Sequence, residues 1–513
     1  GQFEIVERLG LNGEELAQAL RGADAVLVRS ATKITRDSLK YADNLKVIGR
    51  AGVGVDTIDV DAATERGIAV LTAPSGNTIS AAELAFALLL ALVRKVPAAD
   101  RSMKAGEWDR KNFNGVELYG KTLGLVGAGR VGGEVGRRAR AFGMRVIAYD
   151  PYLTADRAKS LEIELVPLAE VLKRADVLSL HVPLTEATTG LIGEAELASM
   201  KPGAVLVNAA RGGVVDEISL ARFLVDGRLA GAALDVFEQE PLPADHPLRK
   251  LPNVVLCPHL GASTAEAQQN VAVEISEAVR AALVDGDLSR AVNAPAIGGE
   301  EMRRIRPLLD LAQKLGLLAS ALSEGAPASV EVRYAGSAEN ALRPLAASAL
   351  IGVLTSVVGR NAVNFVNAMH IAETRGIRLE QVQVGAQRDY AEYVELRVTD
   401  GEEIFVAGAL LAEGHPRVVR IRDYHVDVPP RGTLVVLRNR DVPGVIGRVG
   451  TLLGDAGINI GGYHQSRRAV GGDALAAISV DGKLGRNVVA ALRALPEVVE
   501  VKQVELEGLG IRD

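Results

Sequence analysis

One glycine-rich segment limits the folds open to this chain more than any other feature. The residues Gly127-Ala-Gly129-Arg-Val-Gly132 follow the apolar run LGLV and lead into a helical stretch that continues to about Phe142. Glycines at this spacing allow a tight turn, a close approach of the backbone to a pyrophosphate, and close packing of a helix on a strand. Free amides at the start of the helix attract an anion. The segment therefore predicts the first βαβ unit of a dinucleotide-binding domain.

A carboxylate follows at the position where such a domain binds ribose. The run MRVIAYD predicts a second strand that ends at Asp150, eighteen residues after Gly132. A carboxylate there can accept hydrogen bonds from both ribose hydroxyls and would repel a 2′-phosphate, which favours NAD over NADP. We expect Arg130, just inside the loop, to contact the phosphates. The alternative is a glycine-rich turn that binds no ligand.

The chain is long enough for several domains around this segment. Its 513 residues, 48% of them hydrophobic, predict three or four folding units. Between residues 23 and 258, β-type runs alternate with helical stretches, which is typical of parallel sheets. The tetrapeptides at 80–83 and 263–266 have the spacing of capping boxes, and each precedes a long helix. These two helices bracket the glycine-rich segment, which suggests an inserted domain with two hinges.

The pattern changes after residue 293. A linker, AVNAPAIGGEE, precedes apolar residues at helical spacing, and Asp400-Gly401 between two strand-like runs indicates a hairpin. After a second linker, VPPRG, the elements follow the ferredoxin-like order βαββαβ. We predict a discontinuous first domain (1–76 and 264–295), an inserted domain (77–263), a third domain (296–430) and a fourth (431–513).

Charge and cysteine content exclude several functions. A net charge of -6 and 4% aromatic residues argue against binding of nucleic acid. The single cysteine, Cys257, excludes an intrachain disulfide and a multi-cysteine zinc site, so we expect no metal and a reducing compartment. The most apolar stretch, 84–93, has half the length of a membrane-spanning helix, and GQFEIVERLG lacks a signal-peptide pattern. We therefore expect a cytoplasmic protein with no membrane partner.

Three polar residues follow predicted strands, at the edge where open parallel sheets bind ligands. Arg211 follows AVLVNAA, Glu240 lies in DVFEQEP, and His259 follows VVLCP. An arginine can hold a substrate carboxylate, and a histidine can transfer the proton of a hydroxyl while a 2-hydroxy acid is oxidised. A carboxylate bonded to the imidazole would stabilise its charged form, so Glu240 is a natural partner of His259. The alternatives are a capping or core histidine and a solvated glutamate.

Taken together, these segments resemble a known family. RAGVGVDTIDVDAATERGI, GLVGAGRVGGEV, HVPLTEATTGLI, MKPGAVLVNAARGGVVDE, GAALDVFEQEPL and PHLGASTAEAQ occur in the order found in the D-isomer-specific 2-hydroxyacid dehydrogenases. Over its whole length the chain resembles the long-form members of that family. The resemblance implies an α/β fold: a Rossmann NAD-binding domain inserted in a flavodoxin-like substrate domain, followed by an α+β intervening domain and a C-terminal ferredoxin-like ACT domain.

The resemblance also implies an activity. It is the NAD-dependent oxidation of 3-phospho-D-glycerate to 3-phosphooxypyruvate, the first step of L-serine biosynthesis, by a homotetramer. Arg211 would orient the substrate carboxylate, His259 would act as acid and base, and Glu240 would position and tune His259. Valines at 53 and 182 replace threonines often found there. The implied NAD site comprises Val53, Gly127, Gly129, Arg130, Val131, Gly132, Asp150, Val182, Ala209, Ala210, Asp235, His259, Leu260, Gly261 and Ala262.

The substrate phosphate needs cations besides Arg211. Arg29 in LVRSATK and Arg50 in IGRAGVG are the candidates, with Ser30 and Asn77 as polar neighbours in the first domain. Bidentate arginine suits phosphate oxygens, and the alternative for either arginine is a surface ion pair.

In the ACT domain, the resemblance implies contacts to an L-serine effector from Asn439, Asp441 and Asn459. Asn439 stands where a tyrosine or histidine is expected. The alternative is a dimerising domain without a ligand.

Two other functions remain open. One is another D-2-hydroxy acid dehydrogenase, such as a glyoxylate or hydroxypyruvate reductase, a group that usually lacks the extra C-terminal domains. The other is an NAD-sensing corepressor-like scaffold, which keeps the Arg/Glu/His set but has no ACT domain. Long-form members usually begin with one more strand and helix before a segment like FEIVERLGL, so we expect the first sheet to be about one βα unit short.

Overall fold

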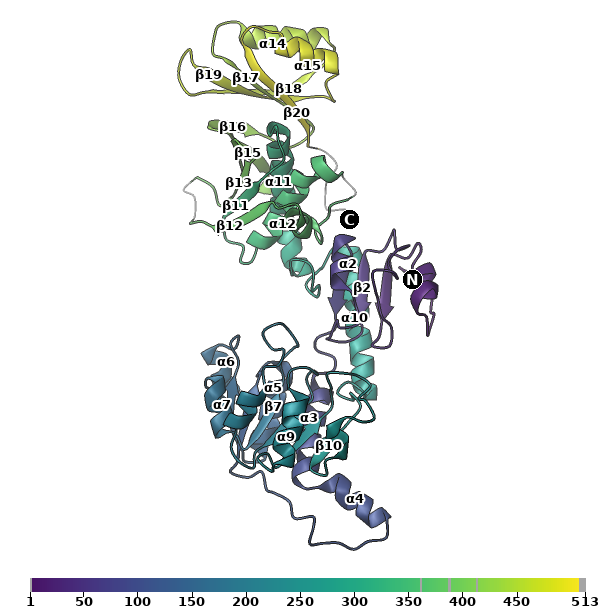
Figure 1. The fold of residues 1–513 in the computed structure, drawn as a ribbon. Coiled ribbons are helices and arrows are strands. Elements are labelled where there is room, and N and C mark those ends of the chain that lie inside the picture. Colours follow the sequence, from purple (N-terminus) through teal and green to yellow (C-terminus); the bar gives the residue numbers. More distant parts are fainter. Residues whose placement is uncertain (1, 360–361, 386–388, 412–413, 507–513) are drawn as a thin grey trace. The chain divides into compact units, whose positions relative to one another are not determined.

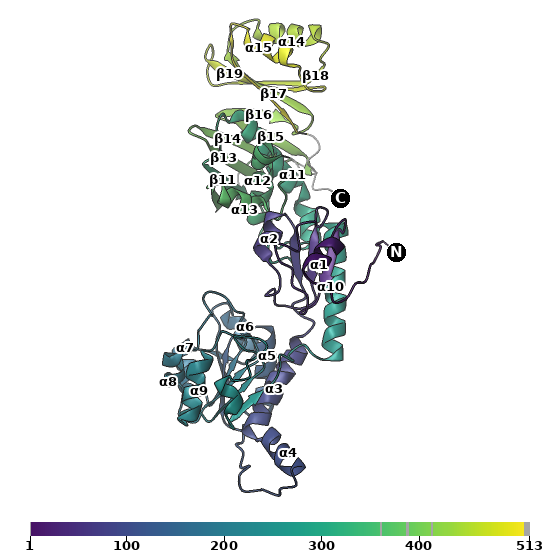
Figure 2. The same cartoon turned by 45° about the vertical axis from the view of Figure 1, so that its right-hand side comes forward.

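The structure, a computed structural model, describes residues 2–359, 362–385, 389–411 and 414–506 (Figures 1 and 2). Its contacts divide the chain into two compact units, residues 73–274 and the remainder. Four sheets of three, seven, six and four strands form within these described ranges. Parallel sheets in the first half of the chain and largely antiparallel sheets in the second give the α/β fold that the sequence predicts.

The unit 73–274 is built on a seven-stranded parallel sheet with the order β10-β9-β8-β7-β4-β5-β6. Strands β4, β7, β8 and β9 are buried along their whole length, as expected for a sheet covered on both faces. Its strands are β4 (Thr122–Val126), β5 (Arg145–Tyr149), β6 (Glu164–Leu165), β7 (Val177–Leu180), β8 (Val205–Asn208), β9 (Gly231–Leu234) and β10 (Val254–Leu256).

Helices cover both faces of this sheet. On one face, α3 (Thr78–Val93) and α5 (Arg130–Ala141) share a core with alternate strand residues such as Leu123 and Leu125. On the other face, α7 (Leu168–Arg174), α8 (Glu194–Ser199) and α9 (Glu217–Val225) pack on Val126 and Leu178. The strand order reverses direction between β4 and β7, which is the switch point where such sheets bind ligands. The unit also contains α4 (Val96–Lys104), α6 (Ala155–Ser160) and the 3-10 helix η1 (Pro247–Lys250).

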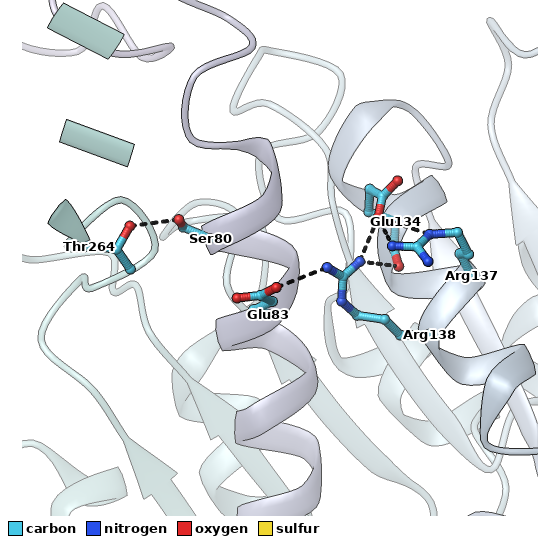
Figure 3. Close-up of polar contacts among 6 residues, drawn as sticks. All are labelled: Ser80, Glu83, Glu134, Arg137, Arg138 and Thr264. Atoms are coloured by element: carbon cyan, nitrogen blue, oxygen red, sulfur yellow. Dashed lines mark hydrogen bonds and ion pairs between the residues drawn. The ribbon is translucent and has the colours of Figure 1, made fainter. Parts of the chain in front are cut away.

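Both predicted capping boxes are wrong. Helix α3 begins at Thr78, so Ser80 lies inside it, and the hydroxyl of Ser80 is 2.7 Å from that of Thr264 (Figure 3). Glu83 does not reach back to the helix start but pairs with Arg138 of α5. In the second case, Thr264 and not Ser263 caps the helix, because its Oγ1 accepts the amide of Ala267 at 3.0 Å. In the first case, side chains distant in the sequence bind the two residues that the local pattern assigned to a cap.

The other unit begins with a three-stranded parallel sheet, β1-β2-β3. Helices α1 and α2 share its core, and the part of α10 from Ile275 packs so closely that a Cβ on Gly49 would lie 2.7 Å from Val279 Cγ2. The strands are β1 (Ala25–Val28), β2 (Val47–Arg50) and β3 (Ala69–Thr72), and the helices are α1 (Gly13–Ala19), α2 (Val60–Glu65) and α10 (Ala265–Asp285).

A six-stranded sheet with the order β12-β11-β13-β14-β15-β16 follows in the same unit. Only the β11–β12 pair is parallel, and α11 and α12 cross where Gly316 and Gly352 let their backbones meet. Its elements are α11 (Gly299–Leu322), β11 (Ser329–Ala335), α12 (Leu342–Val358), α13 (Ala368–Thr374), β12 (Arg378–Gln383), β13 (Glu392–Thr399), β14 (Glu403–Leu410), β15 (Pro416–Ile421) and β16 (Tyr424–Val428).

The last segment has the predicted βαββαβ order. Its antiparallel sheet, β18-β19-β17-β20, packs one face on its own two helices. Residues of the other face, such as Leu434 and Leu475, belong to the same core as α11. The elements are β17 (Thr433–Arg440), α14 (Val445–Asp455), β18 (Ile460–Arg467), β19 (Asp473–Val480), α15 (Arg486–Arg493) and β20 (Val498–Glu505).

Among the helices of the described ranges, none combines the length and the apolar character that crossing a membrane requires. The same ranges contain no group of three or more His, Cys, Asp or Glu side chains placed to hold a metal ion.

Candidate active site

Three neighbouring strands bring polar residues to one edge of the seven-stranded sheet. Arg211 lies in the loop after β8, Glu240 in the loop after β9, and His259 in the loop after β10. Because these strands are parallel neighbours, their carboxyl ends meet at the same edge. The edge also receives the glycine-rich loop that follows β4.

The side chains of His259 and Glu240 are in direct contact. His259 Nδ1 lies 2.8 Å from Glu240 Oε2, and Glu240 Oε1 accepts the backbone amide of Phe237 at 3.1 Å. Toward a carboxylate that accepts hydrogen bonds, Nδ1 would be the donor, which would leave Nε2 to exchange a proton with a substrate. The two side chains are 49% and 38% exposed, so a substrate can reach the imidazole.

The backbone of His259 is held in an unusual conformation. Its φ is +57°, in the left-handed region that residues other than glycine rarely adopt, and its amide donates to the Asp235 carbonyl at 2.8 Å. The buried Asp235 carboxylate accepts the amides of Leu260 at 2.7 Å and Gly261 at 2.9 Å. Burial raises the pKa of the Asp235 carboxyl. The amides of Leu260 and Gly261 both donate to Asp235 and so have partners within the protein. Asp235 thereby holds the loop that follows His259 in place.

Arg211 is oriented by a residue that sequence reasoning missed. Asn208, the buried last residue of β8, donates its side-chain amide to the Arg211 carbonyl at 2.9 Å and accepts the amide of Ala210 at 3.1 Å. Arg211 Nη1 in turn donates to the Ala210 carbonyl at 2.7 Å. An asparagine at the end of an otherwise apolar strand is the sequence signal for such a loop-holding role.

The glycine-rich loop leaves room for a ligand. Gly127 has a φ of +89°, and a Cβ on Gly132 would lie 2.2 Å from the Gly127 carbonyl, so both positions require glycine. A Cβ on Gly129 would meet nothing within 4 Å. Arg130, the exposed first residue of α5, and Val131 follow. Open space above free helix-start amides fits a pyrophosphate.

Asp150, directly after β5, is fixed beside this loop. Its Oδ2 accepts the amide of Ala128 and its Oδ1 accepts that of Tyr152, each at 2.9 Å. Each oxygen keeps a further lone pair, so the carboxylate can still accept from a ribose hydroxyl.

The residue before Val182, His181, was not a candidate from the sequence. It follows β7 at the switch point, and its carbonyl lies 2.6 Å from where a Cβ on Gly127 would stand. Its Nε2 is 2.9 Å from Ser179 Oγ. Burial lowers the pKa of His181 to about 4, which favours the neutral imidazole, while its carbonyl packs against Gly127.

The candidate phosphate ligands fall into both units. Arg29 and Ser30 are exposed directly after β1, and Arg50 ends the neighbouring parallel strand β2. Val53, 43% exposed, lies in the following loop. Asn77 differs from the expectation, because it precedes α3 and belongs to the unit 73–274.

The candidate effector residues do not meet within one copy of the chain. Asn439 and Asp441 lie where β17 ends, near the end of β18, and Asp441 pairs with Arg467 at 3.1 Å. Asn459 precedes β18 and donates to Asp481 at 2.8 Å. The eight residues of β18 separate the two groups by about 25 Å. Asn439 is fully buried, and its Nδ2 donates to the Arg440 carbonyl.

Three known domain families match the chain. The family described as D-isomer specific 2-hydroxyacid dehydrogenase, NAD binding domain, matches residues 86–261. The D-3-phosphoglycerate dehydrogenase intervening domain matches residues 304–422, and the ACT domain matches residues 433–497. These matches confirm the NAD-binding, intervening and ACT domains that the sequence predicts.

Curated relatives match nearly the whole chain. A D-3-phosphoglycerate dehydrogenase of Methanocaldococcus jannaschii is 41% identical over 508 residues, covering 99% of this chain and 96% of that protein. Proteins of the same name from Bacillus subtilis and Mycobacterium tuberculosis are 41% and 42% identical, each covering 98% of this chain and 96% of the relative.

Solved structures match part of the chain. A protein from Thermus thermophilus covers 56% of this chain and 92% of its own, with 39% identity and a TM-score of 0.51. A glyoxylate reductase from Paecilomyes thermophila covers 55% and 88%, with 34% identity and a TM-score of 0.50.

Proposed function

Because the chain belongs to the D-3-phosphoglycerate dehydrogenase family of D-isomer-specific 2-hydroxyacid dehydrogenases, we propose that it oxidises 3-phospho-D-glycerate to 3-phosphooxypyruvate with NAD. In metabolism this is the step that commits 3-phosphoglycerate to L-serine. The single observation that carries the chemistry is the 2.8 Å contact between His259 Nδ1 and Glu240 Oε2 beside the loop of Arg211. The match over the intervening and ACT domains favours this function over reductases and scaffolds that lack them.

In the proposed reaction, His259 acts as the base. Its Nε2 takes the proton of the substrate's 2-hydroxyl, while the contact to Glu240 keeps the proton on Nδ1 and stabilises the imidazolium that forms. In the reverse direction the same nitrogen returns the proton. Glu240 is therefore a positioning residue for His259, and His259 is the catalytic one.

Arg211 holds the substrate carboxylate in this proposal. Its guanidinium offers two parallel donors that match the two carboxylate oxygens. This contact fixes carbon 2 relative to His259. As ligands of the substrate phosphate we propose Arg50 and Arg29, with Ser30 and Asn77 adding neutral hydrogen bonds.

NAD supplies the hydride acceptor when it is bound, and the residues at the sheet edge fit it. Free amides at the start of α5 suit its pyrophosphate, the open space at Gly129 admits it, and Asp150 suits the adenosine ribose. The remaining proposed lining contributes main-chain groups and apolar surface from Val53, Val131, Val182, Ala209, Ala210, Leu260 and Ala262.

Initial rates of NADH formation test the proposed function. With NAD at alkaline pH, where oxidation is favoured, 3-phosphoglycerate should give a far higher kcat/KM than D-glycerate or D-lactate. A preference for an unphosphorylated acid would overturn the substrate assignment, and the absence of any NADH would overturn the reaction.

The assembly and the effector belong to the same proposal. We infer a homotetramer whose contacts include α4, which has no buried residue, and the edge strand β18. Antiparallel pairing of two β18 strands would bring Asn459 of one copy toward Asn439 and Asp441 of another, forming an L-serine site. We also propose four domains with the boundaries predicted from the sequence. One cysteine in 513 residues supports a cytoplasmic location.

A further inference from the structure

A buried carboxylate at the start of α9 touches the loop that carries Glu240. Glu217 is 5% exposed, and its Oε1 accepts the backbone amide of Glu238 at 2.7 Å. Its Oε2 lies 3.3 Å from His246 Nε2, just before η1. Burial raises the pKa of Glu217, and the amide of Glu238 opposes this by stabilising the ionised form. A carboxylate is costly to bury, so its two partners define a specific contact.

Gly212, the residue after Arg211, packs against the same loop. A Cβ on Gly212 would lie 1.8 Å from the Phe237 carbonyl oxygen and 2.6 Å from the Glu238 nitrogen. The backbone of residues 237–238 therefore packs directly against Gly212, and it also donates a hydrogen bond to Glu217. Glu240 lies three positions after Phe237, and its carboxylate itself accepts the Phe237 amide.

We propose that Glu217 is a positioning residue for catalysis, which fixes the 236–241 loop so that Glu240 meets His259. This inference rests on the catalytic roles proposed above. The path runs from Glu217 through the Glu238 amide to Glu240 and then to His259 Nδ1, with contacts of 2.7 Å and 2.8 Å at its two ends. The second oxygen of Glu217 faces His246, whose Nε2 lies 3.3 Å away.

Removing the Glu217 carboxylate should lower kcat with little change in substrate binding. In Glu217→Ala we expect kcat to fall about 10- to 100-fold, because a shift of about 1 Å in a catalytic group costs up to about 100-fold. KM for NAD and for 3-phosphoglycerate should stay within about two-fold, since neither ligand contacts Glu217 in the proposal. Glu217→Gln keeps an oxygen acceptor for the Glu238 amide and should restore kcat to within about three-fold.

The adjacent residue supplies a matched control. Asp216 caps the same helix by accepting the amides of Ile218 and Ser219 at 3.1 Å and 3.0 Å, so Asp216→Ala should weaken the start of α9 but leave the Glu217 carboxylate in place. The kcat of Asp216→Ala should stay within about two-fold of that of the wild type. If Glu217→Ala does not fold, Glu217→Asp retains the charge but cannot reach the Glu238 amide, and should show the same fall in kcat.

A measurement without substrate separates this inference from the proposed function. Amide hydrogen exchange of the peptide 236–242 in the full chain should rise at least ten-fold in Glu217→Ala and Glu217→Asp, and stay unchanged in Asp216→Ala. Unchanged protection, or equal kcat in Glu217→Ala and Asp216→Ala, would overturn the inference even where the wild type oxidises 3-phosphoglycerate. A wild type without that activity, together with increased exchange in Glu217→Ala, would overturn only the proposed substrate.

Discussion

The carboxyl edge of the seven-stranded sheet and the ACT sheet gather their candidate residues in opposite ways. At the parallel edge, loops after adjacent strands place Glu240 and His259 in contact within one copy. In the ACT sheet, β17 and β18 are both antiparallel to β19 and run in the same direction. The helical crossover between them therefore leaves Asn439 and Asn459 at opposite ends of the sheet. A parallel edge can bring its candidate residues together within one copy, whereas the L-serine site proposed above would need a second copy.

Removal of the proposed base, His259, should have the largest effect on the site at the parallel edge. His259→Ala should lower kcat about 100- to 10,000-fold, the usual contribution of a general base. Binding of NADH, followed by its fluorescence, should change less than about two-fold. The control is His425→Ala, in an exposed position of β16. Turnover at the wild-type rate in His259→Ala would remove the residue from proton transfer.

Arg50→Ala tests whether a residue outside the parallel-edge site binds the substrate phosphate. Loss of a bidentate contact to phosphate should raise KM for 3-phosphoglycerate about 10- to 100-fold and leave KM for an unphosphorylated 2-hydroxy acid nearly unchanged. The matched control is Arg36→Ala, an exposed arginine of the same unit that pairs with Glu65. Equal losses with both substrates would contradict a phosphate contact.

Contacts that follow from the order of the strands could be predicted from the sequence, whereas contacts made by the folded loops could not. The closeness of Glu240 and His259 follows from their places after successive strands of a parallel sheet. The contacts of Asp235 and Glu217 could not be predicted, because they depend on which backbone amides the folded loops bring near each carboxylate. The first capping box was wrong for the same reason, since Ser80 and Glu83 have partners distant in the sequence. The second was wrong by one residue, because Thr264 caps the helix in place of Ser263.

Mixing two ACT variants tests whether two copies of the chain share one L-serine site. Alone, Asp441→Ala and Asn459→Ala should each raise the L-serine concentration for half-inhibition about ten-fold, the loss of about 1.4 kcal/mol. Co-assembled tetramers of the two variants should regain sensitive sites, because a site shared by two copies can combine the intact Asp441 of one with the intact Asn459 of the other. Mixed tetramers as insensitive as either parent would contradict a shared site.

The last prediction concerns stability, and it depends on the buried histidine at the parallel edge. Burial lowers the pKa of His181 to about 4, while an exposed histidine titrates near about 6.5. Between these values the unfolded chain binds more protons than the folded one. Stability from the neutral imidazole is therefore complete above pH about 6.5 and is lost as the pH falls toward 4, by at most about 3 kcal/mol.

His181→Asn removes this titration and keeps a polar side chain at the position that follows β7. The variant should show a shallower fall in Tm between pH 6.5 and 4 than the wild type, by several degrees for a unit of this size. Parallel Tm curves over that range would mean that His181 charges in the folded protein. In that case water reaches the imidazole of His181, and the burial to which its lowered pKa is assigned is wrong.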